Sequence, residues 1–157
     1  MGMNSTVIHD HKSAIVIDPG VFPPEIVRIK DYLKQENLTE ISVALTHTHG
    51  DHISGWHAFK KYKTFAHSVV GEKSEPIRNN DVRYLEGMYR KQKYQIPEDL
   101  TFPEPLLFND DGEPVNIPPA DIYFYHVPGH SQDMSVIVIP DERLLLSGDM
   151  LILTPLP

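Results

Sequence analysis

Thr46-His47-Thr48-His49-Gly50-Asp51-His52 is the segment from which the class of this protein can be predicted. It follows an apolar run over residues 41–45 that is typical of a buried β-strand. Imidazole and carboxylate side chains bind zinc and similar divalent ions near pH 7. If the chain stays extended, the first two histidines point to one side, and the Asp-His pair follows where the strand gives way to a helix. We therefore expect one short segment to supply ligands to two adjacent metal ions.

Three other segments carry polar side chains next to predicted strands. Val127-Pro128-Gly129-His130-Ser131 follows a predicted strand, and Leu146-Ser147-Gly148-Asp149-Met150 ends another. The apolar run Ala14-Ile15-Val16-Ile17 leads into the turn Asp18-Pro19-Gly20. Together with the H-x-H-x-D-H stretch, and in the same order along the chain, these segments resemble the metallo-β-lactamase-fold hydrolases. The resemblance is greatest to the glyoxalase II-like and lactonase-like branch.

The resemblance implies a site for two metal ions. The implied ligands are His47, His49 and His130 for one ion, Asp51 and His52 for the other, and Asp149 as a bridge. Asp18 is implied to orient the metal-binding segment, although ordinary turn chemistry explains an Asp-Pro-Gly sequence equally well. Zinc is the expected cofactor because nitrogen and oxygen ligands suit it, and the same ligands are compatible with iron or manganese.

Such a site predicts hydrolytic chemistry. Two cations that share a water molecule lower its pKa towards neutrality. The metal-bound hydroxide would attack an ester, thioester, lactone or related bond of a small-molecule substrate, and Asp51 could orient the hydroxide or transfer its proton. We therefore expect a metal-dependent hydrolase. The alternatives are a non-catalytic metal-binding or assembly module, and an inactive fragment of a larger hydrolase.

The hydrophobic pattern predicts an α/β fold. Residues 6–8 and 14–17 are β-branched runs typical of a hairpin, and Pro23 and Pro24 can begin a helix with an apolar face. A further strand over residues 64–66 continues the alternation of strands and helices. This order predicts one domain over residues 1–157, a layered sandwich like the N-terminal half of the metallo-β-lactamase fold.

The character of the sequence changes between residues 74 and 119. A mixed, aromatic-rich stretch that favours a helix is followed by six prolines that interrupt regular structure. We expect an insertion that overhangs the active site. Its residues Tyr84, Met88 and Tyr89 line a substrate pocket or a dimer contact, or simply pack the segment onto the domain. His67, which follows the predicted strand over residues 64–66, is a further candidate for substrate contact.

Composition narrows the range of functions. The net charge of −8 argues against nucleic-acid binding, and the absence of cysteine excludes disulfides and thiolate ligands. No apolar run is long enough to span a bilayer, so a cytoplasmic location without membrane contact is expected. The chain ends eight residues after Asp149, where the family usually continues and supplies one more histidine. We therefore expect a C-terminally short form with a weaker second metal site, which associates as a homo-oligomer.

Overall fold

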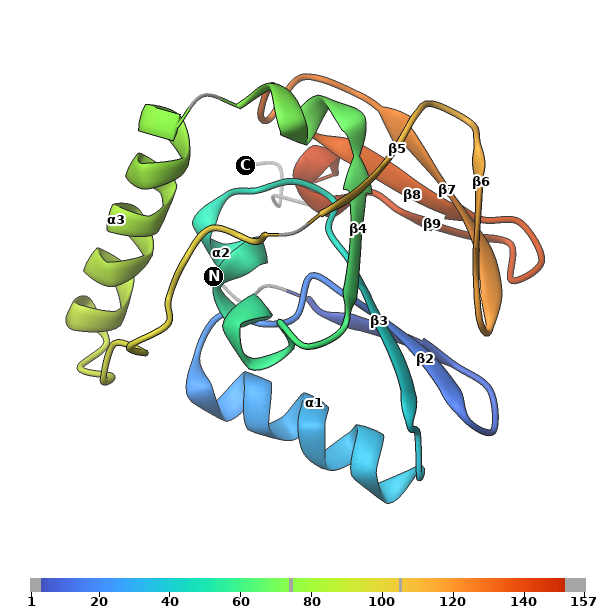
Figure 1. Ribbon diagram of the computed structural model, residues 1–157, viewed down its shortest axis with the longest axis horizontal. Helices are drawn as coiled ribbons and strands as arrows, with labels where there is room; N and C mark the ends of the chain where they lie inside the picture. Colours follow the sequence, from blue (N-terminus) through green and yellow to red (C-terminus); the bar gives the residue numbers. More distant parts are fainter. Residues whose placement is uncertain (1–3, 74, 105, 152–157) are drawn as a thin grey trace, which may run out of the picture.

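The computed structural model describes residues 4–73, 75–104 and 106–151. Two β-sheets lie face to face, and helices cover the outer face of the first sheet (Figure 1). The three layers arise because one sheet buries apolar side chains on both of its faces. The predicted layered α/β fold is confirmed.

The first sheet has five strands in the order β1-β2-β3-β4-β5. Their bounds are Thr6–His9 for β1, Ser13–Ile17 for β2, Glu40–Ala44 for β3, Lys63–His67 for β4 and Leu107–Asn109 for β5. Strand β1 is antiparallel to β2, as predicted for the hairpin, whereas the pairs from β2 to β5 are parallel. Parallel strands end at the same edge of a sheet, so the segments that follow β2, β3 and β4 are brought together there.

Strand β2 shows why the chain forms layers. Every residue of this strand is buried. Ala14 and Val16 contact the helices, whereas Ile15 and Ile17 face the second sheet. Successive strand residues point to opposite faces, so an uninterrupted apolar run is the expected sequence of a strand that is covered on both sides.

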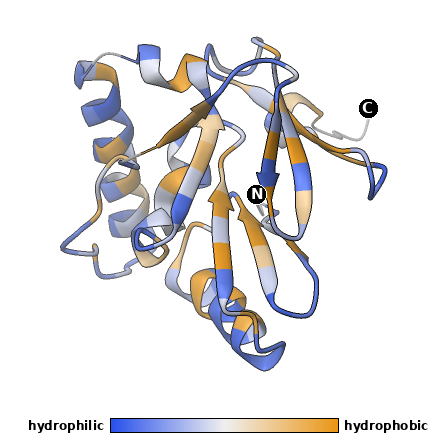
Figure 2. Cartoon of the chain, turned by 45° about the vertical axis from the view of Figure 1, so that its right-hand side comes forward, coloured by the Kyte–Doolittle hydropathy of each residue, from blue (hydrophilic) through white to orange (hydrophobic). Residues whose placement is uncertain are grey.

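The helical layer is built from short elements and two longer helices. Their bounds are Pro23–Gln35 for α1, Gly50–Ile53 for α2 and Glu75–Lys91 for α3, with 3₁₀ turns at Ser54–Ala58 (η1) and Ser68–Glu72 (η2). Helix α1 buries Ile26 and Leu33 on one face, and most of its exposed residues are polar, as the hydropathy colouring shows (Figure 2). Glu25 stabilises the start of α1 because its carboxylate accepts hydrogen bonds from the backbone N–H groups of Val21 and Phe22.

The second sheet is antiparallel and has the order β6-β7-β8-β9. Its strands span Pro114–Ile117 (β6), Ala120–His126 (β7), Ser135–Ile139 (β8) and Leu144–Leu146 (β9), and the 3₁₀ turn η3 covers Gly148–Met150. Ile122 and Phe124 of β7 and Ile137 of β8 pack against the first sheet. This packing brings the loops after β7 and β9 next to the segments that follow β2 and β3.

The region predicted as an insertion departs from expectation in its second half. Helix α3 forms where a helix was predicted, but β5 joins the first sheet and β6 begins the second. Helix α3 and the described residues between it and β5 are thus the main part of this region that lies outside the two sheets. Among the described residues, no helix combines the length and the hydrophobicity needed to cross a bilayer.

Candidate metal centre

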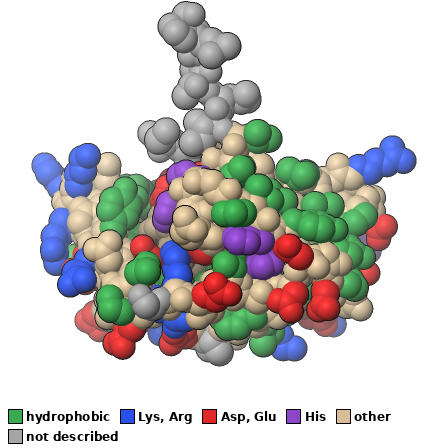
Figure 3. Space-filling model, turned by 90° about the horizontal axis from the view of Figure 1, so that it is seen from above, with side chains coloured by type: hydrophobic (Ala, Val, Ile, Leu, Met, Phe, Trp, Pro, Cys, Tyr) green, Lys and Arg blue, Asp and Glu red, His purple; other side chains and the backbone are tan. Residues whose placement is uncertain are grey.

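The candidate ligands lie just beyond the ends of strands. His47 and His49 follow β3, His52 lies on α2, His130 lies between β7 and β8, and Asp149 lies in η3 after β9. The sheets hold these strand ends in place, so side chains far apart in the sequence can meet at one edge of the molecule. Histidine and acidic side chains are visible together on the face seen in Figure 3.

Three histidines form the first candidate ligand set. His47, His49 and His130 each offer a ring nitrogen, and these nitrogens lie within 4.8 Å of one another. The Nδ1 atom of His49 and the Nε2 atom of His130 are 2.9 Å apart, although the two residues are 81 positions apart in the sequence. The structure thus brings together the three imidazoles that the sequence analysis assigned to one ion.

A second candidate set shares one histidine with the first. Ligand atoms of His47, His52 and Asp149 also lie within 4.8 Å of one another. The Oδ1 atom of Asp149 is 3.3 Å from His52 Nε2, and its Oδ2 atom is 3.4 Å from His130 Nε2. Asp149 therefore faces both sets, as a bridging carboxylate must.

Two ring nitrogens of this cluster have no hydrogen-bond partner among the described residues and could bind a cation. His47 Nε2 and His52 Nε2 are buried, and neither makes a hydrogen bond within the described part of the chain. A buried polar atom without a partner is costly, and a metal ion would satisfy it. The donor set of imidazole nitrogens and a carboxylate is one that zinc and related divalent ions prefer.

Burial and neighbouring charges give the histidines different proton affinities. Burial, reinforced by the adjacent imidazoles of His52 and His49, lowers the pKa of His47 to about 2. Burial and the nearby His130 also lower the pKa of His49. For His52, burial opposes the charged form, but the hydrogen bond and charge of Asp18 outweigh it and raise the pKa. His47 and His49 are therefore neutral near pH 7, with lone pairs available for a cation.

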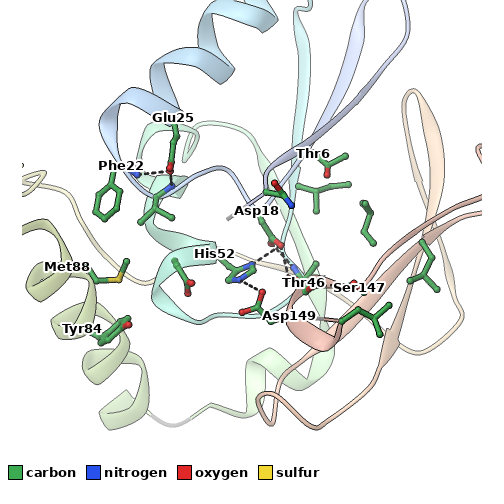
Figure 4. A pocket seen from close by; sticks show the side chains of 18 residues that line it. Thr6, Asp18, Phe22, Glu25, Thr46, His52, Tyr84, Met88, Ser147 and Asp149 are labelled. Carbon is green, nitrogen blue, oxygen red and sulfur yellow. Dashed lines mark hydrogen bonds and ion pairs between the residues drawn. The ribbon is translucent and has the colours of Figure 1, made fainter. Parts of the chain in front are cut away.

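Asp18 is hydrogen-bonded at several points to the segment that carries the candidate ligands. Its Oδ2 atom lies 2.9 Å from His52 Nδ1 and accepts a hydrogen bond from Thr46 Oγ1, and its Oδ1 atom accepts one from the Thr46 N–H group. A His52 ring that donates from Nδ1 keeps Nε2 free to face Asp149, and Figure 4 shows His52 between the two carboxylates. These contacts support a positioning role for Asp18 in addition to its place in a turn.

Asp51 differs from the expected arrangement. It belongs to neither of the two close sets, which contain His52 and Asp149 without it. Asp51 instead lines an adjacent cavity of about 610 Å³ together with His52 and Asp149. Helix α2 begins at Gly50, and consecutive residues of a helix point in different directions, which is consistent with Asp51 lying outside the sets that contain His52.

Helix α3 supplies one wall of this cavity. Tyr84 and Met88 are four positions apart on the helix and both line the cavity (Figure 4). Phe22, Leu146 and Leu151 add apolar surface elsewhere in the wall. The cavity thus combines a polar end at the candidate ligands with apolar sides.

His67 lies in a different environment and is not among the residues that line the cavity. Its Nε2 atom is 2.9 Å from Asp111 Oδ1, its Nδ1 atom accepts a hydrogen bond from the Val69 N–H group, and its ring stacks on His126. These contacts give no support to the expected substrate contact. Both ring nitrogens of His67 already have partners within the protein.

The sequence analysis missed a charged group that lies between the ligand segments. Asp133 is buried and accepts two hydrogen bonds from Thr48, which separates His47 from His49. Burial opposes its ionised form, but these hydrogen bonds and the charge of Lys73 prevail and lower the pKa of Asp133 to about 2. The only local signal was a carboxylate three residues after His130, and nothing in the sequence near it indicates Thr48 as a partner.

This chain is a layered sandwich of helices and two sheets, and its histidines cluster at the ends of strands. These features are typical of a class of α/β proteins that bind metal ions. The family model described as "Metallo-beta-lactamase superfamily" matches residues 2–157, and the chain belongs to that superfamily. The fold of this superfamily is one that binds divalent metal ions.

Individual relatives agree with this assignment. The chain is 26% identical over 151 residues to a probable metallo-hydrolase, YqgX of Bacillus subtilis, and 24% identical over 148 residues to the hydroxyacylglutathione hydrolase GloC of Haemophilus influenzae. Each alignment covers 94% of this chain and 65% of the relative, so the chain spans about two thirds of their length. The solved structure of the BLEG-1 B3 metallo-beta-lactamase superposes with a TM-score of 0.68 at 27% identity, covering 96% of this chain and 68% of that one.

Proposed function

We propose that this chain is a metal-dependent hydrolase that cleaves an ester, thioester or lactone bond of a small molecule. The observation that carries the proposal is the convergence of His47, His49 and His130, with the buried His47 Nε2 lacking a hydrogen-bond partner among the described residues. The similarity to a hydroxyacylglutathione hydrolase supports an acyl-transfer substrate, because an acylglutathione is a thioester.

The residues have distinct proposed roles. His47, His49 and His130 would hold one zinc ion, and His52 and Asp149 would hold a second, with Asp149 between them. Iron or manganese would compete for the same donors. When bound, such an ion acts as a Lewis acid and makes water a nucleophile near neutral pH.

The surrounding side chains would handle protons and substrate. Asp18 holds His52 through Nδ1, which leaves Nε2 as the ligand atom. Asp51 would orient the attacking water and take up its proton, because it lines the cavity beside His52. Tyr84 and Met88 would contact the apolar part of the substrate. A cavity of about 610 Å³ is large enough for a small molecule.

The proposal is tested with chelator-treated protein reloaded with Zn²⁺, Mn²⁺ or Fe²⁺. A panel of S-acylglutathiones, chromogenic esters and lactones would be assayed for metal-dependent turnover. His49→Ala is expected to abolish turnover and to weaken metal binding, whereas the matched variant His11→Ala, at an exposed turn, should change neither. Stoichiometric metal binding without turnover of any panel member would instead indicate a metal-binding or assembly module.

A further inference from the structure

A buried charged cluster connects the two segments that carry the candidate ligands. Asp133 has a side chain that is only 2% exposed, and its Oδ2 atom accepts hydrogen bonds from the Thr48 N–H group at 2.9 Å and from Thr48 Oγ1 at 2.6 Å. Thr48 lies between His47 and His49, and Asp133 lies three residues after His130. One carboxylate oxygen therefore joins the histidine segment after β3 to the histidine loop after β7, across 85 positions of sequence.

A lysine from a third segment completes the cluster. Lys73, which follows η2, places Nζ 3.2 Å from Asp133 Oδ2 and 3.1 Å from Asp81 Oδ2 on α3, and it donates a hydrogen bond of 2.5 Å to Thr48 Oγ1. The Lys73 side chain is 12% exposed. The ammonium group donates hydrogen bonds to Thr48 and Asp81 and forms an ion pair with Asp133, so the charge of Lys73 is compensated within the cluster.

The hydrogen-bond directions in this cluster are mutually consistent. The Thr48 hydroxyl donates its single proton to Asp133 and accepts from Lys73. A threonine, a carboxylate and an ammonium group are all needed for this arrangement. Removing the ammonium group would leave Asp133 and Asp81 as two partly or fully buried carboxylates without their shared cation, which is unfavourable.

The two ligand segments are also held together directly beyond this cluster. The Ser135 N–H group and the Ser135 hydroxyl both donate to the Thr46 carbonyl oxygen, at 2.9 Å and 2.7 Å. Hydrogen bonds thus join Thr46 to Ser135 and Thr48 to Asp133. The second pair, which carries the charge, is the one closer in sequence to His49 and His130.

We propose that Asp133 is a positioning residue of the metal centre: with Lys73 as its charge partner, it holds Thr48 so that His49 and His130 stay at ligand distance from each other. This inference rests on the proposed function only in taking the histidine cluster as a metal site. In the described part of the chain, Asp133 makes no hydrogen bond to a candidate ligand side chain and acts through Thr48, which lies between two of them. Groups that orient metal ligands in this way typically contribute 10- to 100-fold to metal affinity.

The test measures metal binding rather than turnover. Chelator-treated wild-type protein and Asp133→Asn would be titrated with Co²⁺ and followed by the visible absorption bands, which report ligand number and geometry. Asp133→Asn is expected to bind Co²⁺ about 10-fold more weakly and with altered bands. Asp141→Asn removes the same charge at an exposed turn between β8 and β9 and should match the wild type.

Thr48 provides a second pair of variants in case Asp133→Asn does not fold. Thr48→Ser keeps the hydroxyl and should retain the wild-type affinity and bands, whereas the near-isosteric Thr48→Val should weaken binding. A double-mutant cycle with Lys73→Met is expected to show that the effects of Lys73→Met and Asp133→Asn on Co²⁺ affinity are not additive.

The outcomes separate the two proposals. Unchanged Co²⁺ affinity and bands in a folded Asp133→Asn, or in Thr48→Val if Asp133→Asn does not fold, would overturn the positioning role and leave the metal site intact. Failure of the wild-type protein to bind Co²⁺ would instead overturn the metal site, and with it the proposed function.

Discussion

His52 Nδ1 lies 2.9 Å from Asp18 Oδ2, and this pair determines which nitrogen of His52 faces the candidate metal centre. A carboxylate can only accept, so the ring donates from Nδ1, and in the neutral ring the lone pair then lies on Nε2, 3.3 Å from Asp149 Oδ1, where a bound cation could use it. The same carboxylate also accepts from Thr46, so its position is fixed independently of His52.

Asp18→Asn is therefore expected to weaken the second metal site. The Asn amide can donate to His52 Nδ1, which would move the ring proton to Nε2 and remove the ligand lone pair. Asp18 has a positive φ of 50°, which Asn also tolerates, so the turn should survive. We expect about 10-fold weaker binding of the second equivalent of Zn²⁺ with the first little changed, measured by calorimetric titration. Asp31→Asn on the exposed face of α1 is the control.

Gly148 has a backbone conformation and surroundings that disfavour a side chain. Its φ is +50°, and an added Cβ would lie 2.4 Å from Met134 Cε and 2.9 Å from Thr46 Oγ1. Gly148→Ala should lower the free energy of unfolding by about 1–3 kcal/mol and displace the adjacent Asp149.

Gly87→Ala is the matched control for this change, because an added Cβ on that helical residue meets nothing within 4 Å. It should raise the free energy of unfolding by roughly 0.5–1 kcal/mol, since alanine favours helices over glycine. Urea denaturation gives both values. Equal effects of the two substitutions would argue against the close approach at Gly148.

The metal-free protein is expected to be most stable near pH 6.5. The pKa of His47 is lowered to about 2, so below the ordinary value of 6.5 the unfolded chain binds a proton that the folded chain does not. Stability then falls with falling pH, by up to about 1.4 kcal/mol per unit from this residue. The pKa of His52 is raised, so its contribution is present below 6.5 and is lost as the pH rises through the folded value.

Urea denaturation of chelator-treated protein between pH 5 and pH 8 would show both limbs of the stability curve, which are the falls in unfolding free energy on the acid and the alkaline side of its maximum. His47→Gln should flatten the acid limb and His52→Gln the alkaline limb, while His11→Gln, at an exposed position, should leave the curve as it is. A curve that keeps both limbs in all three variants would show that other groups cause them.

Tyr84 is expected to act on substrate binding and to have little effect on the metal centre. It lines the cavity from α3, whereas Ile77 lies on the same helix, is exposed and is not part of the lining. Tyr84→Ala should raise KM about fivefold, the equivalent of about 1 kcal/mol, with kcat and metal content nearly unchanged. Ile77→Ala should behave like the wild type, and an equal loss in both variants would point to a general effect on α3.

The outer face of the second sheet leads us to expect self-association. Tyr123, Val138 and Leu145 form a cross-strand row, and Tyr125 pairs with Val136 beside it. Tyr125 is 41% exposed and Leu145 is 55% exposed. A contiguous apolar face of this kind favours association.

Light scattering across a concentration series would detect this association. Tyr125→Lys should reduce it by placing a charge in the middle of the face. Asn116→Lys adds the same charge to the neighbouring strand β6, where the side chain is already polar and exposed, and should have a smaller effect. A mass equal to one chain at all concentrations would contradict the expectation.

The sequence alone predicted the elements that depend on the spacing of neighbouring residues, such as a buried strand and a histidine segment. The apolar run over residues 41–45 and the H-x-H spacing after it indicated a buried strand and a ligand segment, and the structure has strand β3 there, followed by two histidines of a close set. Strand β5 could not be predicted, because its three residues follow a proline-rich stretch and are paired only through contact with β4. Asp51 and His52 were expected to bind the same ion, but only His52 belongs to a close ligand set among the described residues.

The charged cluster was beyond prediction for a different reason. Thr48 and Asp133 meet only because both sheets and the loops between them are in place, and neither residue has a neighbour in sequence that indicates the other. The same holds for Lys73, whose partners come from three different segments. Contacts of this kind follow from tertiary packing, and a single sequence carries no local signal for them.

The separation of 81 positions between His49 and His130 has a consequence for how the protein matures. While the chain is being synthesised, the early histidines leave the ribosome long before their partner, and they have no complete ligand set until β7 has docked. Metal uptake should therefore follow the docking of β7, and the holo form would indicate that the histidine loop has packed beside the first sheet.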